Sequence, residues 1–184
     1  TTDIAVGAYR DDDGGLDHGA VYVLFLNPDG TVKAQQKISQ TSGGLGVTLD
    51  QEDSFGWSVE PIGDLDGDGV IDLAVGATRD DGGETDLLRD YGAVYLLELR
   101  RDGTVKATRR LAADTPPFGA VLRPGDRFGA DVALLGDLDG DGVEDIAVGA
   151  FGDDPLKSGR VFVLPLNPDG SVKSFTEIGA NLGG

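Results

Sequence analysis

The sequence contains no cysteine and no methionine, and it has a single histidine, His18. The absence of cysteine excludes disulfide bonds, cysteine-held iron–sulfur clusters and a thiol nucleophile. Basic residues are scarce, because 15 Lys and Arg face 33 Asp and Glu, which gives a formal net charge of −18. An acidic surface repels phosphate groups and anionic lipids, so the composition argues against nucleic-acid binding and membrane docking. No apolar run reaches the roughly 18 residues needed to cross a bilayer, so no membrane insertion is expected.

Aspartate and glycine are the abundant residues. The chain has 27 Asp but 6 Glu, and 30 of its 184 residues are Gly. Glutamate favours helices, whereas aspartate favours turns, helix caps and sites for hard cations. The composition therefore predicts a β protein rich in loops, and it is compatible with bound Ca²⁺.

The chain repeats itself with a period of about 70 residues. The heptapeptide GDLDGDG occupies 63–69 and returns 73 residues later at 136–142. A following segment with the pattern D(I/L)AVGA occurs three times, at 3–8, 72–77 and 145–150. Longer segments that combine GxV(Y/F)xL with DG(T/S)VK begin at Gly19, Gly92 and Gly159. A fixed order of motifs at this spacing indicates a repeat architecture.

Each unit is predicted to form a four-stranded antiparallel sheet. The apolar runs rich in Val and aromatic residues are typical of strands and lie at 21–26, 94–99 and 161–166. Each run leads through an Asp-Gly turn into a further strand, which is predicted to start at Val32, Val105 and Val172. In the middle unit the strands are predicted at 55–59, 72–77, 92–99 and 105–111.

Tandem four-stranded units are typical of β-propeller blades. The small Gly, Ala and Val residues of the second strand suit the place where adjacent blades converge. Separate small β modules are the less favoured alternative, because a lone sheet of this size would expose two apolar faces.

Two loops carry the pattern of a cation site. Carboxylates stand at loop positions 1, 3, 5 and 9, namely Asp64, Asp66, Asp68, Asp72 and Asp137, Asp139, Asp141, Asp145. Gly69 and Gly142 at position 6 permit a sharp bend, and Val70 and Val143 at position 7 offer a backbone carbonyl. An all-oxygen, flexible cage of this kind suits Ca²⁺ better than Mg²⁺. The competing interpretation is a solvated acidic turn.

An EF-hand would require a Glu at loop position 12 and flanking helices. Position 12 is Val75 or Val148, inside an expected strand. The loops are therefore predicted to belong to β-hairpins.

The ordered motifs FGxxV, DxDxDGxxD(I/L)AVGA and GxV(Y/F)xL resemble FG-GAP repeats, which form the propeller of integrin α subunits and occur in many bacterial secreted proteins. The proline of the name-giving Gly-Ala-Pro is replaced by Tyr9, Thr78 and Phe151. The resemblance implies an all-β, partial β-propeller of FG-GAP type. It also implies two Ca²⁺ sites on its lower face, with the ligands Asp64, Asp66, Asp68, Val70, Asp72 and Asp137, Asp139, Asp141, Val143, Asp145.

The motifs predict one propeller segment over 1–184, with an incomplete blade at 1–40 and full blades at 55–111 and 128–178. Asp3 aligns with Asp72, so the first copy lacks its first strand and most of a metal loop. About two and three-quarter blades are fewer than the roughly four needed to close a ring. A fragment of a longer protein is the favoured explanation, in agreement with the missing methionine. Assembly of several copies and an open stack of blades are the alternatives.

The favoured function is that of a non-catalytic, calcium-stabilised adhesion or recognition module, secreted or on a cell surface. Its partner would be a protein or glycan bound on the face opposite the metal loops. That face would be built by the loops at 9–18, 78–91, 151–158, 39–54 and 112–127. In these loops, the aromatic side chains and the histidine are expected to pack against the blades rather than bind a ligand: Tyr9, His18, Tyr91, Phe118 and Phe151. Trp57, on an expected first strand, is predicted to belong to the core rather than to contact a ligand.

Two alternatives stay open. One is a structural subunit of an extracellular filament or surface layer, which would self-associate through the incomplete blade. The other is an accessory propeller of a secreted hydrolase, since such repeats accompany hydrolase domains in some proteins. Nothing in the sequence indicates catalysis within the chain itself.

Overall fold

The computed structural model describes residues 3–81, 89–117, 121–152 and 159–179. Within these ranges the regular elements are 11 strands in three antiparallel sheets. The first sheet contains β1 (Ile4–Ala8), β2 (Ala20–Leu26) and β3 (Val32–Ser39). The second contains β4 (Phe55–Pro61), β5 (Leu73–Ala77), β6 (Ala93–Leu99) and β7 (Val105–Leu111). The third contains β8 (Phe128–Gly136), β9 (Asp145–Ala150), β10 (Arg160–Leu164) and β11 (Thr176–Gly179).

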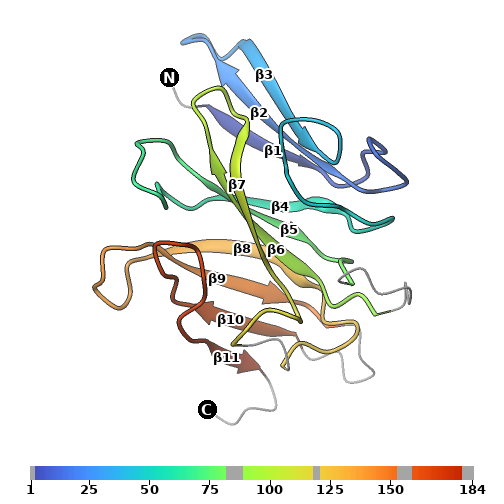
Figure 1. Cartoon of the computed structure of the whole chain (residues 1–184), viewed down its shortest axis with the longest axis vertical. Coiled ribbons are helices and arrows are strands. Elements are labelled where there is room, and N and C mark those ends of the chain that lie inside the picture. Colours follow the sequence, from blue (N-terminus) through green and yellow to red (C-terminus); the bar gives the residue numbers. More distant parts are fainter. Residues whose placement is uncertain (1–2, 82–88, 118–120, 153–158, 180–184) are drawn as a thin grey trace.

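The three sheets follow one another along the long axis of the molecule (Figure 1). Their strands are hydrogen-bonded in chain order, so each sheet is a meander, and the predicted all-β partial propeller is confirmed. The hairpins β4–β5 and β8–β9 project on one side of the sheets, whereas the loop from β1 to β2 and the connections between sheets lie on the other side (Figure 1). Within the described ranges, no helix is long and apolar enough to cross a membrane.

The apolar cores lie between neighbouring sheets. One cluster joins side chains of the first and second blades, including Val21, Phe55 and Tyr95. The other joins the second and third blades, including Leu96, Phe128 and Phe162. The same edge-to-face ring contact recurs in both, with 5.5 Å between the ring centroids of Phe55 and Tyr95 and 5.5 Å between those of Phe128 and Phe162.

Glycines let neighbouring blades meet backbone to backbone. A Cβ atom built on Gly76 of β5 would lie 1.9 Å from the carbonyl oxygen of Gly129 in β8. The same distance, 1.9 Å, separates a Cβ on Gly7 of β1 from the carbonyl oxygen of Gly56 in β4. The small residues predicted to mark the convergence of the blades therefore lie at both seams between them.

Replacing Gly76 with alanine is expected to destabilise the chain by about 1–3 kcal/mol, because the added methyl overlaps a backbone atom that cannot move freely. Urea unfolding followed by far-ultraviolet circular dichroism measures the change. Gly149 of β9 is the matched control, because its Cβ would meet its closest neighbour at an ordinary 3.6 Å. Equal destabilisation by Gly149→Ala would show that loss of backbone freedom, and not the seam, limits these positions.

The last strand differs from the expectation. The strand predicted to start at Val172 is reduced there to an isolated bridge with Leu166, and β11 begins only at Thr176. Pro165 stands where the other blades have Phe25 and Glu98. Because proline has no N–H to donate, it interrupts the ladder after β10.

The prediction that Trp57 belongs to the core is wrong, since this side chain on β4 is 40% exposed. Phe151 is also exposed, whereas His18 is buried and Tyr91 packs against the core as expected. Phe118 lies outside the described residues. The exposure of Trp57 coincides with an irregularity in the pairing of β4 with β5, whose register shifts between Phe55 and Val59, so Trp57 does not follow the simple alternation that would place it beside the buried Phe55.

Candidate metal centres in two acidic hairpins

Each acidic loop is curled around its first aspartate. The carboxylate of Asp64 accepts hydrogen bonds from the N–H groups of Asp68, at 2.9 Å, and Gly69, at 2.8 Å. Asp137 accepts the equivalent bonds from Asp141, at 3.1 Å, and Gly142, at 2.8 Å. The glycine at position 6 makes this curl possible, because its φ of 83° in the first loop and 88° in the second is unfavourable for other residues.

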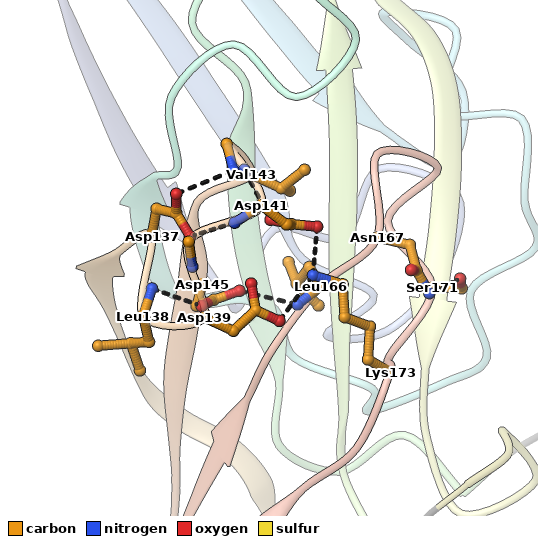
Figure 2. Close-up of polar contacts among 12 residues, drawn as sticks. Asp137, Leu138, Asp139, Asp141, Val143, Asp145, Leu166, Asn167, Ser171 and Lys173 are labelled. Carbon is orange, nitrogen blue, oxygen red and sulfur yellow. Dashed lines mark hydrogen bonds and ion pairs between the residues drawn. The ribbon is translucent and has the colours of Figure 1, made fainter.

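The ninth loop residue ties the hairpin to the end of the third strand. Asp145 is fully buried, and its two oxygens accept the N–H groups of Leu138 and Leu166, each at 2.9 Å (Figure 2). Asp72 accepts those of Leu65 and Leu99, each at 2.8 Å. Burial raises the pKa of the Asp72 carboxyl, although these two backbone bonds act in the opposite direction.

The first copy retains part of this arrangement. Asp3 accepts the N–H of Leu26 at 2.9 Å, in the way that Asp72 accepts that of Leu99. Asp3 thus occupies the ninth position of the motif, as its alignment with Asp72 predicted.

Three of the predicted side chains come together in each loop. Carboxylate oxygens of the residues at positions 1, 3 and 9 lie within 4.8 Å of one another, in the groups Asp64, Asp66, Asp72 and Asp137, Asp139, Asp145. Charges of one sign at this spacing repel one another, and a cation between them would relieve the repulsion. The donors are all oxygen atoms, so the residues fit a hard cation such as Ca²⁺.

The residues at position 5 are not part of these groups. Asp141 is paired with Lys173, whose Nζ also lies 2.8 Å from Asp139 Oδ2 (Figure 2). In the first loop Lys106 pairs with Asp66, and its Nζ lies 3.5 Å from Asp68 Oδ2. At position 7 the N–H of Val70 donates to Asp68 at 2.9 Å, and that of Val143 donates to Asp141 at 2.9 Å.

The two lysines hold charged hydrogen bonds with the loops. The hydrogen bond from Lys173 lowers the pKa of the Asp141 carboxyl, and that from Lys106 lowers the pKa of Asp66. The sequence reasoning missed both lysines as parts of the site. Their position at the end of the DG(T/S)VK motif, in each unit that has a full acidic loop, was the available signal.

Comparisons with known proteins agree with this picture. The FG-GAP repeat family model matches residues 128–164, which include the whole second loop. Human integrin alpha-10 is 34% identical over 146 residues, 79% of this chain and 11% of the relative. Integrin alpha pat-2 of Caenorhabditis briggsae is 37% identical over 70% of the chain and 9% of the relative. Human integrin alpha-IIb is 40% identical over 60% of the chain and 10% of the relative.

The chain therefore spans about a tenth of the length of these integrin α subunits. The similarity to human integrin alpha-10 extends over most of the chain, and the family model covers the third blade from β8 to β10. Together with the repeated motifs and the meander sheets, it shows that this chain belongs to the FG-GAP repeat family of integrin α type.

Proposed function

We propose that the chain is a non-catalytic, calcium-stabilised recognition module of the adhesion type that works outside the cell. The observation that carries this proposal is the pair of acidic hairpins, each with three carboxylates within 4.8 Å, in a chain related to integrin α subunits. Extracellular Ca²⁺ near millimolar levels suits weak sites of this kind, with dissociation constants of about 10⁻⁴–10⁻³ M. The proposal treats 1–184 as one propeller segment with blades at 1–40, 55–111 and 128–178.

Each hairpin would hold one Ca²⁺ ion. In the proposed sites, Asp68 and Asp141 exchange their lysine partners for the ion, and Val70 and Val143 add backbone carbonyl oxygens. The complete ligand sets are Asp64, Asp66, Asp68, Val70, Asp72 and Asp137, Asp139, Asp141, Val143, Asp145. Bound Ca²⁺ would stabilise the conformation of each hairpin. Because the buried ninth residue is also hydrogen-bonded to the end of the third strand, the ion would stabilise the blade as well.

The partner would bind on the face away from the acidic hairpins. Three aromatic side chains from three different blades gather there, with 4.7 Å between the ring centroids of Tyr9 and Trp57 and 6.4 Å between those of Trp57 and Phe151. Arginines lie over the outer rings, Arg10 over Tyr9 and Arg127 over Phe151. Trp57 and Phe151 are exposed, and Tyr9 and Arg127 are partly exposed. Accessible aromatic and arginine side chains on a rigid scaffold are typical of protein and glycan recognition.

Replacing Trp57 with alanine is expected to weaken binding to the partner at least tenfold, as loss of a central aromatic contact does in other interfaces. A panel of purified extracellular-matrix proteins and a glycan array, both in millimolar Ca²⁺, provide the measurement. Ile178→Ala is the matched control, because Ile178 is 57% exposed on β11, remote from the aromatic group. Equal binding by both variants would reject the aromatic face, and absence of any bound protein or glycan would reject the recognition role.

The filament alternative has one observation in its favour. Strand β1 is the edge of its sheet, and its residues Ile4 and Val6 are 44% and 46% exposed. A hollow of about 330 Å³ lies beside it, lined by Ile4, Val59 and Ile71 among others. An unpaired apolar edge favours pairing with another strand. Light scattering over a hundredfold range of concentration tests this alternative, and a constant monomer mass would reject it.

A further inference from the structure

Each acidic hairpin has a lysine ammonium group against the carboxylates that are proposed to bind the ion. Lys173 forms ion pairs with Asp141 and with Asp139, where Nζ lies 2.8 Å from Oδ2 (Figure 2). Lys106 forms the equivalent two pairs in the first loop. In both hairpins the carboxylates at positions 3 and 5 therefore share one positive charge that the chain itself supplies.

The backbone brings the two lysines to the same place. Each follows a valine that pairs with the residue whose N–H the ninth aspartate accepts. In the third blade, Lys173 follows Val172, which forms a bridge with Leu166. The N–H of Leu166 donates to Asp145 at 2.9 Å. Lys106 stands at the equivalent point of the second blade, so the lysine is a regular part of the repeat.

The first blade has the same lysine without the acidic loop. Lys33 follows Val32, which pairs with Leu26, and the N–H of Leu26 donates to Asp3 at 2.9 Å. Lys33 is exposed, and within the described part of the chain it has no carboxylate partner. The same backbone position thus carries an ion-paired lysine in the two repeats whose full acidic loop is described.

The lysine and a metal ion would compete for the same carboxylates. Ca²⁺ binds carboxylate oxygens at about 2.3–2.6 Å, so an ion held at positions 3 and 5 would lie close to the ammonium group. Charges of +2 and +1 on the same two side chains repel each other. The ion would therefore reach its full ligand set once the lysine has left, and the lost ion pairs would lower its affinity.

The two lysines differ in how tightly they are held. The side chain of Lys173 is 23% exposed and lies close to both of its carboxylates. That of Lys106 is 42% exposed, and its Nζ is 3.5 Å from Asp68 Oδ2. Water and salt screen a partly buried ion pair less than an exposed one. Lys173 is therefore the stronger competitor.

We propose that Lys106 and Lys173 are internal counter-ions that compete with Ca²⁺ for the acidic hairpins, so that the loop at 64–72 fills before the loop at 137–145. This inference rests on the proposed calcium sites and adds the residues that set their affinity and order. Without calcium, the lysine stabilises its hairpin by neutralising part of the charge. When calcium binds, the lysine is released from the loop.

A titration of the ¹⁵N-labelled 184-residue chain with CaCl₂, followed by nuclear magnetic resonance, tests the proposal. The amide signals of Gly69 and Gly142, at position 6 of each loop, report the two loops separately. Lys173→Met keeps the apolar stem but removes the charge. It is expected to lower the dissociation constant at Gly142 about three- to tenfold, the factor that two such ion pairs correspond to. Lys106→Met is expected to lower that at Gly69 by a smaller factor.

Lys33→Met is the matched control, because Lys33 has the same place in the repeat and no described carboxylate partner. It is expected to leave both dissociation constants unchanged. Lys173→Gln serves as a second variant if Lys173→Met folds poorly, since it also removes the charge but stays polar.

Melting curves supply a readout that separates competition from a merely structural role. In EDTA, Lys173→Met is expected to melt at a lower temperature than the wild-type chain, because its carboxylates lose their counter-ion. Its rise in melting temperature on adding Ca²⁺ is expected to exceed that of the wild-type chain. A lysine that only supports the hairpin would lower the melting temperature equally in both conditions.

The proposal is overturned if the wild-type chain binds Ca²⁺ and the uncharged variants of Lys173 bind it no more tightly. It is also overturned if Gly142 responds at lower Ca²⁺ concentrations than Gly69 in the wild-type chain. Failure of the calcium sites themselves would look different, because neither glycine signal would respond to Ca²⁺ in any variant.

Discussion

Replacing Asp145 with alanine is expected to destabilise the chain by about 3–5 kcal/mol, since hydrogen bonds to a charged group contribute about 1.5–3 kcal/mol each. The substitution removes the acceptor for two backbone N–H groups, those of Leu138 and Leu166. One of these groups lies in the acidic loop and the other follows β10, so the change also separates the hairpin from the rest of its blade. Urea unfolding in EDTA measures this effect without any contribution from bound metal.

Two further variants separate the structural role of Asp145 from its proposed role as a ligand. Asp145→Asn keeps an acceptor oxygen, so in EDTA it is expected to be less destabilised than Asp145→Ala. It is also expected to lose most of the stabilisation that Ca²⁺ bound to the loop at 137–145 would provide. Asp3→Ala is the matched control, because Asp3 is exposed and is described with a single such bond, from Leu26. If Asp3→Ala lowered the free energy of unfolding as much as Asp145→Ala, neither the burial of Asp145 nor its second hydrogen bond would explain the effect.

Removing calcium is expected to produce the second large effect. An ion that binds only the folded chain stabilises it by RT ln(1 + [L]/Kd), which is about 0.4–1.4 kcal/mol per site in millimolar Ca²⁺ for dissociation constants of about 10⁻⁴–10⁻³ M. For a chain of this length, each kcal/mol corresponds to roughly 2–4 °C in melting temperature. Excess EDTA is therefore expected to lower the melting temperature by about 1–6 °C per occupied site relative to millimolar Ca²⁺, measured by differential scanning calorimetry.

The identity of the ion is tested in the same experiment. Restoring Ca²⁺ after chelation is expected to recover the full melting temperature, whereas Mg²⁺ at the same concentration is expected to recover less, because it gives up its water ligands reluctantly. Identical melting curves in EDTA and in millimolar Ca²⁺ would contradict the structural role of the metal. A full recovery with Mg²⁺ would leave that role intact but reject the choice of ion.

The sequence predicted the sheets well because each local pattern was consistent with its neighbours in the repeat. The middle blade shows this most clearly, since the predicted strands at 92–99 and 105–111 differ from β6 and β7 by no more than one residue at either end. Glycines at fixed places, such as Gly69 and Gly76, carry information about turns and close approaches that a single sequence can reveal. The two acidic loops could be recognised from the sequence because their aspartates and glycines also stand at fixed places in the repeat.

Other features depend on which side chains meet in space. Lys106 and Lys173 reach the acidic loops from a neighbouring hairpin, and their distance along the chain from the first aspartate of the loop differs between the two blades. The exposure of Trp57 depends on the irregular pairing of β4 with β5 and on what covers that strand. The recurring lysine of the DG(T/S)VK motif is visible in the sequence, but only the fold shows which acidic side chains it contacts.

The position of the two cores has a consequence for cooperativity. Each core joins adjacent blades, and β5 of the middle blade is buried along its whole length, whereas β1 is half exposed. In a chain of this design the free energy of unfolding is a sum of nearest-neighbour terms, one for each pair of blades. A single blade separated from its neighbours would have no core, so the smallest folding unit is a pair. Amide hydrogen exchange is then slowest in the middle blade, and each repeat gained by duplication adds one coupling energy to the array.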